Sequence, residues 1–497
     1  MAPDSPSAGR RGYAVLAFTA CSVLLFCALL LRDYDHPLAR IRRTAEEGSW
    51  KQLFSSPRTT CGISPSLLNE FGLHNFRLSQ VHVGSGYRTQ RFLDKAQHGE
   101  KLRVGLIGGS GALTFPLFLA SLAQPPSLTV SLGHGTDTVT GQRNKYGAVP
   151  VQEQWHQLVM RYLEEAFPTA ELHFRNGAKP ATDSSFFEWC WTSLIGTDVD
   201  LVFIELAVND DPNTSFTSSE NLLRSLLQLD SQPAVVYVDT FSLHNTFAGK
   251  QQTLLSAQDI QSTLSPFYDV PQVSARPALL PAMIRDHSLK KPWFRGDERH
   301  GSTRLHRFLG SMVVGYLMEE RCRIDELTLD AEGGGDWPNR AALVTVPQVT
   351  MRERWNSTEV HATKPPACAT AGAGLVPANE PQDWKLVDWK YSKYYYEALV
   401  PNSDEIIFNV DVREGAQGFV AISYLRSRQY DLGRARCMVG ERGADIDGHW
   451  ENSASLAQTA IIADKVPPGR HRVRCRTLAA DGSSRRSAFR VMGVMSV

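Results

Sequence analysis

The apolar residues of this 497-residue chain follow two different periods in its two halves. In the first half, apolar residues recur every three or four positions in residues 151–167 and 303–321, which predicts amphipathic helices. Four short apolar runs predict buried strands: residues 102–107, 171–174, 199–204 and 234–238. Parallel strands need crossover connections, so alternating strands and helices predict a three-layer α/β/α unit over residues 102–325, built on a parallel sheet.

In the second half the period shifts to two. Apolar and polar residues alternate over residues 406–412. Four further strand-like runs follow, with turn residues between them: residues 418–425, 460–463, 471–475 and 488–492. This pattern predicts an antiparallel β-sandwich over residues 384–497. Glycines and prolines interrupt residues 326–383, which we expect to form a linker.

The N-terminus carries a continuous apolar run at residues 13–31, after a short tail of residues 1–12. A helix of this length, at ~1.5 Å per residue, matches the hydrocarbon thickness of a bilayer. We therefore expect a transmembrane signal anchor, with a cleaved signal peptide as the alternative. Residues 32–101 show only modest periodicity and are expected to form a stem.

Two N-glycosylation triplets begin at Asn213 and Asn356, both after the anchor. They would be modified only in the secretory lumen or outside the cell, which predicts a single-pass type II membrane protein of the Golgi, secretory lumen or cell surface. Six cysteines lie outside the apolar run, an even number that suits an oxidising compartment. Cys437 and Cys475 fall in or near strand-like runs, and we expect them to pair.

Charge and motifs exclude several function classes. Lysine plus arginine equals aspartate plus glutamate, 52 each, so no global field would attract nucleic acid. The cysteine spacing forms no zinc motif, and neither a Gly-x-Gly-x-x-Gly fingerprint nor a P-loop follows a strand. We therefore expect no metal and no organic cofactor.

Three polar motifs follow strands or precede a helix. Ser110 ends the glycine turn after the first strand, and Asn209 and Asp210 follow a middle strand. Asp297 and His300 are three residues apart, just before the last helix, a spacing that lets a base and its orienting carboxylate share one loop. Each motif alone also fits an ordinary turn or surface loop, so only their combination indicates a catalytic site.

In this order the motifs resemble the SGNH (GDSL-like) hydrolase superfamily, over about residues 102–321. The overall layout is similar to membrane-anchored SGNH-domain proteins of fungi and algae that carry a C-terminal β domain. The resemblance implies that Ser110 is the nucleophile, His300 the general base and Asp297 its partner. It implies an oxyanion hole made of the Asn209 amide and the backbone N–H groups of Ala181 and Ser110.

Some positions depart from the family pattern. Gly109 stands where the family has aspartate, and Ala207 and Ala181 stand where it has glycine. The resemblance implies an esterase if water accepts the acyl group, or an O-acyltransferase if a sugar hydroxyl does, with an acylated glycan or small ester as substrate. A catalytically inactive scaffold that binds polysaccharide through its β domain is the alternative.

Aromatic residues crowd the start of the β domain: Trp384, Trp389, Tyr391, Tyr394, Tyr395 and Tyr396. Their rings suit either stacking on sugars or packing inside the sandwich, and packing is the simpler expectation.

Overall fold

The computed structural model separates the chain into two compact units, Met1–Cys61 and Gly62–Val497. The residues that it describes all belong to the second unit: 63, 65–109, 149, 151–243, 254–296, 298–324, 345–357, 365–388, 394–414, 418–451, 455–479 and 487–497. The predicted anchor at residues 13–31 lies outside them. None of the helices within these ranges is both long enough and apolar enough to cross a membrane.

The predicted strand–helix alternation is confirmed. In chain order the α/β part contains α4 (Pro65–Phe71), α5 (Leu73–Ser79), β1 (Gln80–His82), α6 (Tyr87–Gln97), β2 (Lys101–Gly108), η2 (Val151–Glu153), α7 (Trp155–Ala166), β3 (Glu171–Asn176), α8 (Ser184–Ile195), β4 (Leu201–Glu205), α9 (Phe216–Leu227), β5 (Ala234–Asp239), α10 (Ala257–Phe267), β6 (Gln272–Ser274), α11 (Arg276–Arg285), η3 (His287–Lys290) and α12 (Thr303–Cys322). The sheet order is β1-β6-β5-β4-β2-β3. Strands β2 to β6 are parallel, and β1 joins β6 as an antiparallel edge strand.

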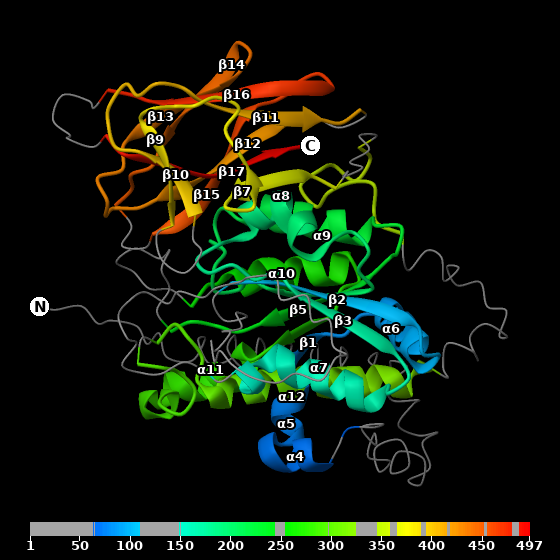
Figure 1. Cartoon of the computed structure of the whole chain (residues 1–497). Coiled ribbons are helices and arrows are strands. Elements are labelled where there is room, and N and C mark those ends of the chain that lie inside the picture. The colour runs from blue at the N-terminus through cyan, green and yellow to red at the C-terminus, as the bar shows by residue number, and fades with distance from the viewer. Residues whose placement is uncertain are drawn as a thin grey trace, which may run out of the picture. The chain divides into compact units, whose positions relative to one another are not determined.

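Helices cover both faces of this sheet (Figure 1). On one face α7 and α12 pack on alternate strand residues such as Val104, Phe203 and Val236. On the other face α8, α9 and α10 pack on the residues between them, including Val202 and Val235. Because every central strand is buried on both sides, its sequence is a continuous apolar run, which is why these strands were predictable.

The α/β part begins earlier than expected. Residues 65–97, which we assigned to a stem, form α4 to α6 and β1, and Phe76 and Phe92 from this segment are buried in the core. Helix α6 also buries polar side chains: the Arg88 guanidinium donates to the Pro233 and Leu227 carbonyls, and Gln90 donates to Glu320. These buried polar residues conceal the helical period in the sequence.

The β domain contains β7 (Ala367–Ala371), β8 (Gly374–Leu375), β9 (Trp384–Asp388), β10 (Tyr394–Ala398), β11 (Ile406–Val412), β12 (Val420–Arg426), β13 (Arg434–Val439), β14 (Arg442–Asp447), β15 (Leu456–Ala463), β16 (Gly469–Thr477) and β17 (Phe489–Ser496). One sheet has the order β15-β12-β17-β10-β9 with β7 beside β17, and the other has the order β11-β16-β13-β14. Both face a common apolar core, so the predicted sandwich is confirmed.

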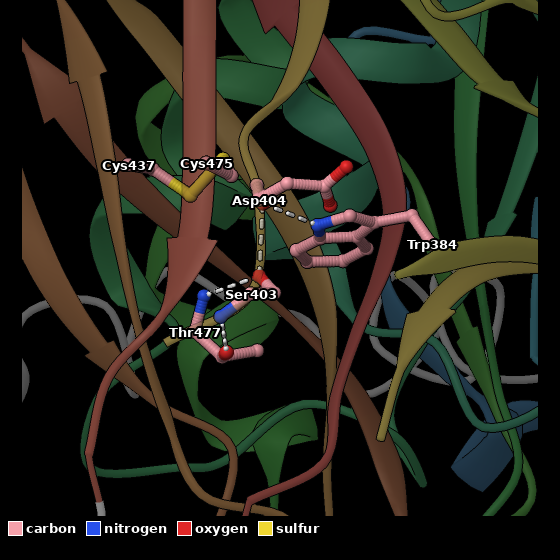
Figure 2. The surroundings of a disulfide bond; sticks show 6 residues. All are labelled: Trp384, Ser403, Asp404, Cys437, Cys475 and Thr477. Atoms are coloured by element: carbon pink, nitrogen blue, oxygen red, sulfur yellow. Dashed lines mark hydrogen bonds between the residues drawn. A yellow bond between two sulfur atoms is a disulfide. The ribbon is translucent and has the colours of Figure 1, made fainter. Parts of the chain in front are cut away.

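The disulfide between Cys437 and Cys475 is confirmed and joins the neighbouring strands β13 and β16 (Figure 2). Near it, Ser403 and Thr477 exchange hydrogen bonds, each hydroxyl accepting from the other residue's backbone N–H. Trp384 is buried and its indole N–H donates to the Asp404 carbonyl. With Tyr395 and Tyr396 also buried, the described members of the aromatic run mainly pack the sandwich.

The segment expected to be a linker contributes to both parts. Strands β7 and β8 lie within residues 326–383, and β7 pairs with β17. Residues 345–353 cross the α8–α9 side, where the buried Arg224 guanidinium donates to the carbonyls of Pro347, Gln348 and Val349. A disulfide joins Cys190 of α8 to Cys368 of β7. These contacts use scattered polar residues and one short strand, so the sequence pattern does not reveal them.

Candidate active site

The predicted motifs meet where the strand order reverses. Strand β2 lies between β3 and β4. The chain leaves β2 for β3 through α7 on one face of the sheet, and it leaves β4 for β5 in the opposite direction through α9 on the other face. In open α/β sheets the crevice outside the carboxyl ends at such a switch point is the usual ligand site. Gly109 follows β2 and Asn209 follows β4, and both are at this edge.

Gly109 and Asn209 are in close contact. The Gly109 N–H donates to the Glu205 carbonyl at 3.1 Å, which continues the β2–β4 ladder past the end of β2. A Cβ atom on residue 109 would overlap Asn209 Oδ1 and lie 2.5 Å from its Cγ and 3.0 Å from its Nδ2. The Asn209 side chain therefore occupies the space that a side chain at 109 would fill, which explains the glycine found in place of the family's aspartate.

A tight turn after β4 orients Asn209. The Leu206 carbonyl accepts from the backbone N–H of Asn209 at 2.9 Å and of Asp210 at 3.0 Å. The Asp210 carboxyl is buried and accepts from the Ser184 N–H at 2.6 Å and from the Ser219 hydroxyl at 3.0 Å. Burial raises the pKa of Asp210 to about 7. Asp210 thus attaches the turn to the N-terminus of α8.

The turn that carries Ala181 follows β3 and runs along the end of β2. The Asn176 side chain accepts from the Ala178 N–H at 2.9 Å, and the Lys179 N–H donates to the Gly108 carbonyl at 2.9 Å. Ala181 has φ +54°, in the left-handed region that favours glycine. The backbone therefore keeps a conformation suited to the family's glycine although the residue is alanine.

His300 lies on a loop fixed at both ends. Phe294 and Gly301 form an isolated β-bridge, and the Arg295 N–H donates to the His300 carbonyl at 2.9 Å. Ser302 is the N-cap of α12, and its hydroxyl also donates to the Pro292 carbonyl at 2.7 Å. This anchoring places His300 three residues before the start of α12, where it is half-buried.

His300 borders a hollow at the carboxyl edge of the sheet. Among the described residues the hollow is lined by Trp155, Glu205, Val208, Thr240, Arg299, His300, Gly301, Leu305, His306 and Leu309. Val208 directly precedes Asn209 in the chain, and the Glu205 carbonyl accepts a hydrogen bond from the Gly109 N–H. The structure therefore brings together His300, the Asn209 turn and the residue that precedes Ser110.

Two ionisable side chains in the walls of this hollow have pKa values that favour their neutral forms. Burial, reinforced by the nearby Asp239 carboxyl, raises the pKa of Glu205 well above its usual range. Burial, with Arg295 and His300 nearby, lowers the pKa of His306 to about 4. Glu205 Oε2 and Trp155 Nε1 are buried without a hydrogen-bond partner. Such perturbed and unsatisfied groups in a hollow are typical of functional sites.

Ser110 and Asp297 lie outside the described residues, so the predicted nucleophile and the predicted partner of His300 stay predictions. Asn213 and Asn356, the two glycosylation candidates, are both exposed. Among the described residues no group of three or more histidine, cysteine or carboxylate side chains is arranged to hold a metal ion.

Sequence reasoning missed two residues of this edge. Glu205 is the last residue of β4, and a charged residue at the end of an apolar run, four positions before Asn209, was the available signal. Asp183 caps α8 and accepts from the Ser185 N–H at 3.1 Å. Its signal was an aspartate just before two serines and an apolar run, the composition of a helix N-terminus.

The described residues form a three-layer α/β/α domain followed by a β-sandwich domain. The chain is similar to the solved structure of a two-domain esterase active on acetylated mannans, with a TM-score of 0.54, 18% identity, and coverage of 84% of this chain and 97% of that one. The same esterase co-crystallized with mannopentaose matches with a TM-score of 0.53 and 17% identity, at the same coverage. A GDSL-like protein of Parabacteroides merdae matches 45% of this chain and 96% of its own, with a TM-score of 0.31 and 15% identity.

No family model matches the sequence, and no curated protein matches it. At these identities the likeness shows the fold, and it shows that both domains occur together in one solved protein.

Proposed function

We propose that this protein is a serine-dependent esterase that removes acyl groups from a glycan. The observation that carries the proposal is the meeting of Gly109, the Asn209 turn and His300 at the switch point of the sheet. The two-domain likeness to an esterase active on acetylated mannans supports an acylated polysaccharide as the substrate class.

In the proposed reaction His300 accepts the proton of the Ser110 hydroxyl as Oγ attacks the ester carbonyl carbon, and Asp297 orients the imidazole. The Asn209 amide and the N–H groups of Ala181 and Ser110 donate to the oxyanion. When the C–O bond breaks, His300 gives the proton to the leaving sugar oxygen, which becomes a hydroxyl. Water then attacks the acyl-serine and releases the acid, whereas attack by another sugar hydroxyl would make the protein an O-acyltransferase.

The Gly109 departure does not argue against activity, because Asn209 fills the space of the missing side chain. This weakens the ground for an inactive polysaccharide-binding scaffold. A fluorophosphonate probe separates the two proposals: we expect wild-type labelling, none in Ser110→Ala, and full labelling in the β-domain control Ser487→Ala. Absence of labelling, or labelling that persists in Ser110→Ala, would contradict the esterase.

Substrate class is tested by acetate release. We expect the wild-type chain to release acetate from acetylated mannan. Adding unacetylated mannopentaose distinguishes the two acceptors: an esterase releases the same amount of acetate, while a transferase yields acetylated mannopentaose instead. Release from small aryl esters but not from mannan would retain the esterase and overturn the glycan substrate.

We further propose that the chain is held by residues 13–31 as a type II membrane protein, with its catalytic part in the secretory lumen or outside the cell. The disulfides Cys190–Cys368 and Cys437–Cys475 support an oxidising compartment, and exposed Asn213 and Asn356 support glycosylation. Glycosidase treatment should lower the apparent mass of the wild type, and the shift should disappear in the Asn213→Gln, Asn356→Gln double variant. A cytosolic, unglycosylated chain would overturn this topology.

A further inference from the structure

An edge strand of the β domain is hydrogen-bonded to the turn that carries Ala181. Strand β15 is at one end of its sheet, so the N–H groups on its outer side have no strand partner. The Ala457 N–H donates to the Ala181 carbonyl at 3.4 Å, and Gln458 Nε2 donates to Asp183 Oδ2 at 3.2 Å. The β domain therefore contacts the same turn that we propose as an oxyanion donor.

Asp183 connects this contact to the rest of the site. Its carboxyl is buried and accepts from the N–H of Ser185 at 3.1 Å and from the Ser185 hydroxyl at 2.6 Å. The next residue, Ser184, donates its N–H to Asp210, directly after Asn209. One chain of hydrogen bonds thus runs from Gln458 through Asp183 and Ser184 to the Asn209 turn.

The Ala181 conformation needs support from its surroundings. Left-handed backbone is unfavourable for a non-glycine residue, and such conformations persist where neighbouring structure holds them. Within the turn, Lys179 is fixed to Gly108 and Asp183 to Ser185, which leaves Ala181 between the two anchors. The Ala457 bond is made to Ala181 itself, from outside the α/β part.

The contact is also fastened from a second direction. Helix α8, which Asp183 caps, is joined to β7 by the Cys190–Cys368 disulfide, and the Thr192 hydroxyl donates to the Pro366 carbonyl at 2.9 Å. The Gln458–Asp183 hydrogen bond holds the start of α8 against the β domain, and the contacts of Cys190 and Thr192 hold its body there. This fixes β15 relative to the turn.

We propose that β15 is a positioning element of the active site, acting through Gln458 and the Ala457 N–H to hold the Ala181 turn in the geometry that receives the oxyanion. The proposal rests on the proposed function for its catalytic consequence, although the bracing of the turn is a separate, measurable property. It makes the β domain part of the catalytic unit.

The test uses Gln458→Met, which keeps the side-chain volume and removes the donor. We expect kcat for acyl-ester hydrolysis to fall about 10-fold while KM stays within two-fold, since a displaced oxyanion donor affects the transition state and a single donor is worth about 100- to 1000-fold. Gln382→Met is the matched control, because Gln382 is exposed on the β domain and its side chain donates only to Glu380. The control should match the wild type.

Ala457→Pro provides an independent variant. It removes the N–H that faces Ala181 but not a bond within the ladder, and proline is tolerated on edge strands. It should lower kcat in the same way. Wild-type kcat in both variants would overturn the proposal.

Hydrogen exchange separates this inference from the proposed function. Amides of residues 181–187 should exchange faster in Gln458→Met and Ala457→Pro than in Gln382→Met, whether or not the chain is an esterase. An inactive wild type would defeat the proposed function while faster exchange still supported the brace. Unchanged exchange in both variants would overturn the brace, even in an active enzyme.

Discussion

Buried carboxyl groups gather at the carboxyl edge of the α/β sheet, whereas the buried polar side chains of the described β domain are mostly hydroxyls. Glu205, Asp210 and Asp239 are fully buried, and burial raises the pKa of all three. The β domain buries one arginine, Arg490, and these hydroxyl residues: Ser403, Ser423, Ser427, Thr477 and Ser496.

The difference indicates that the β domain is a structural scaffold and that the carboxyl edge of the α/β sheet is a functional site. A buried hydroxyl is neutral and needs one or two hydrogen bonds, as the Ser403–Thr477 exchange illustrates. A buried carboxyl must stay protonated or lose its hydration, so it lowers stability at neutral pH. Groups of this kind concentrate where chemistry needs them. Substitutions at the two regions should therefore affect different quantities: turnover at the first and stability at the second.

The largest effect is expected from Gly109→Ala. The added methyl group would overlap Asn209 and move the amide and the adjoining Ser110, so kcat/KM should fall about 1000-fold, the upper value for loss of an oxyanion donor. Gly374→Ala in the β domain is the control, because a Cβ there meets nothing within 4 Å. The control should cost some stability, since Gly374 has φ +92°, but no turnover. Equal turnover in the two variants would refute the role of the Gly109–Asn209 contact.

The next effect concerns stability. Replacing Cys437 and Cys475 with alanine opens a loop whose ends are 38 residues apart, and should lower the free energy of unfolding by about 3 kcal/mol. Turnover per folded molecule should stay unchanged, because this bridge lies within the second β sheet. Denaturant unfolding and active-site titration measure the two quantities.

The Cys190→Ala, Cys368→Ala pair is the comparison for that experiment. It releases α8 from β7 and should lower both stability and turnover. Equal loss of turnover in both double variants would contradict the expectation that the Cys437–Cys475 disulfide affects stability and not turnover.

The central strands and the last helix were predicted well, because the apolar residues that bury each of them lie within one short stretch of sequence. Val104 and Phe203 belong to apolar runs that need no partner to be recognised. The β-sandwich was predictable for a related reason: β11 alternates buried and exposed residues along its length.

Contacts between distant polar residues were not predictable. Gln458 and Asp183 are 275 positions apart, and nothing in either local sequence indicates the other. Helix α6 was missed because it buries Arg88 and Gln90 among its apolar residues. For the site, motif order located the Asn209 and His300 loops, but only the packing explains why position 109 is glycine.

A smaller effect is the pH dependence of stability. Burial raises the pKa of Asp210 and Glu188 to about 7 and of Asp239 to about 8, so the folded state holds protons that the unfolded state has lost. Their stabilising contribution is complete below the unfolded pKa, near 4, and is lost as pH rises through 7 and 8. Tm should therefore fall as pH rises from 6.5 to 8.5. His306, whose pKa is lowered to about 4, opposes this trend only below pH 6.5.

Asp210→Asn tests the assignment. An amide can accept from Ser184 and face the Ser219 hydroxyl without ionising, so about 1 kcal/mol of the pH dependence between 6.5 and 8.5 should disappear. In the β domain Arg436 lowers the pKa of Asp445, which is why Asp445→Asn should leave the slope in this window unchanged. Calorimetry at several pH values gives both slopes. If the stability of Asp210→Asn changed with pH as steeply as that of the wild type, the protons released in this window would belong to other groups.

The smallest effect is expected from Ala181→Gly, which introduces the glycine of the SGNH pattern that the sequence resembles. Glycine removes the strain of φ +54°, but it also gains entropy in the unfolded chain, and the two terms of about 1 kcal/mol nearly cancel. Stability should change by less than about 0.5 kcal/mol, as in Lys465→Gly, a β-domain position with φ +51°. Turnover should stay within about two-fold, because the backbone N–H that serves the oxyanion is retained. Ala181→Pro removes that N–H and cannot keep φ +54°, so it should abolish turnover; an active proline variant would exclude Ala181 as a donor and leave the oxyanion to Asn209 and Ser110.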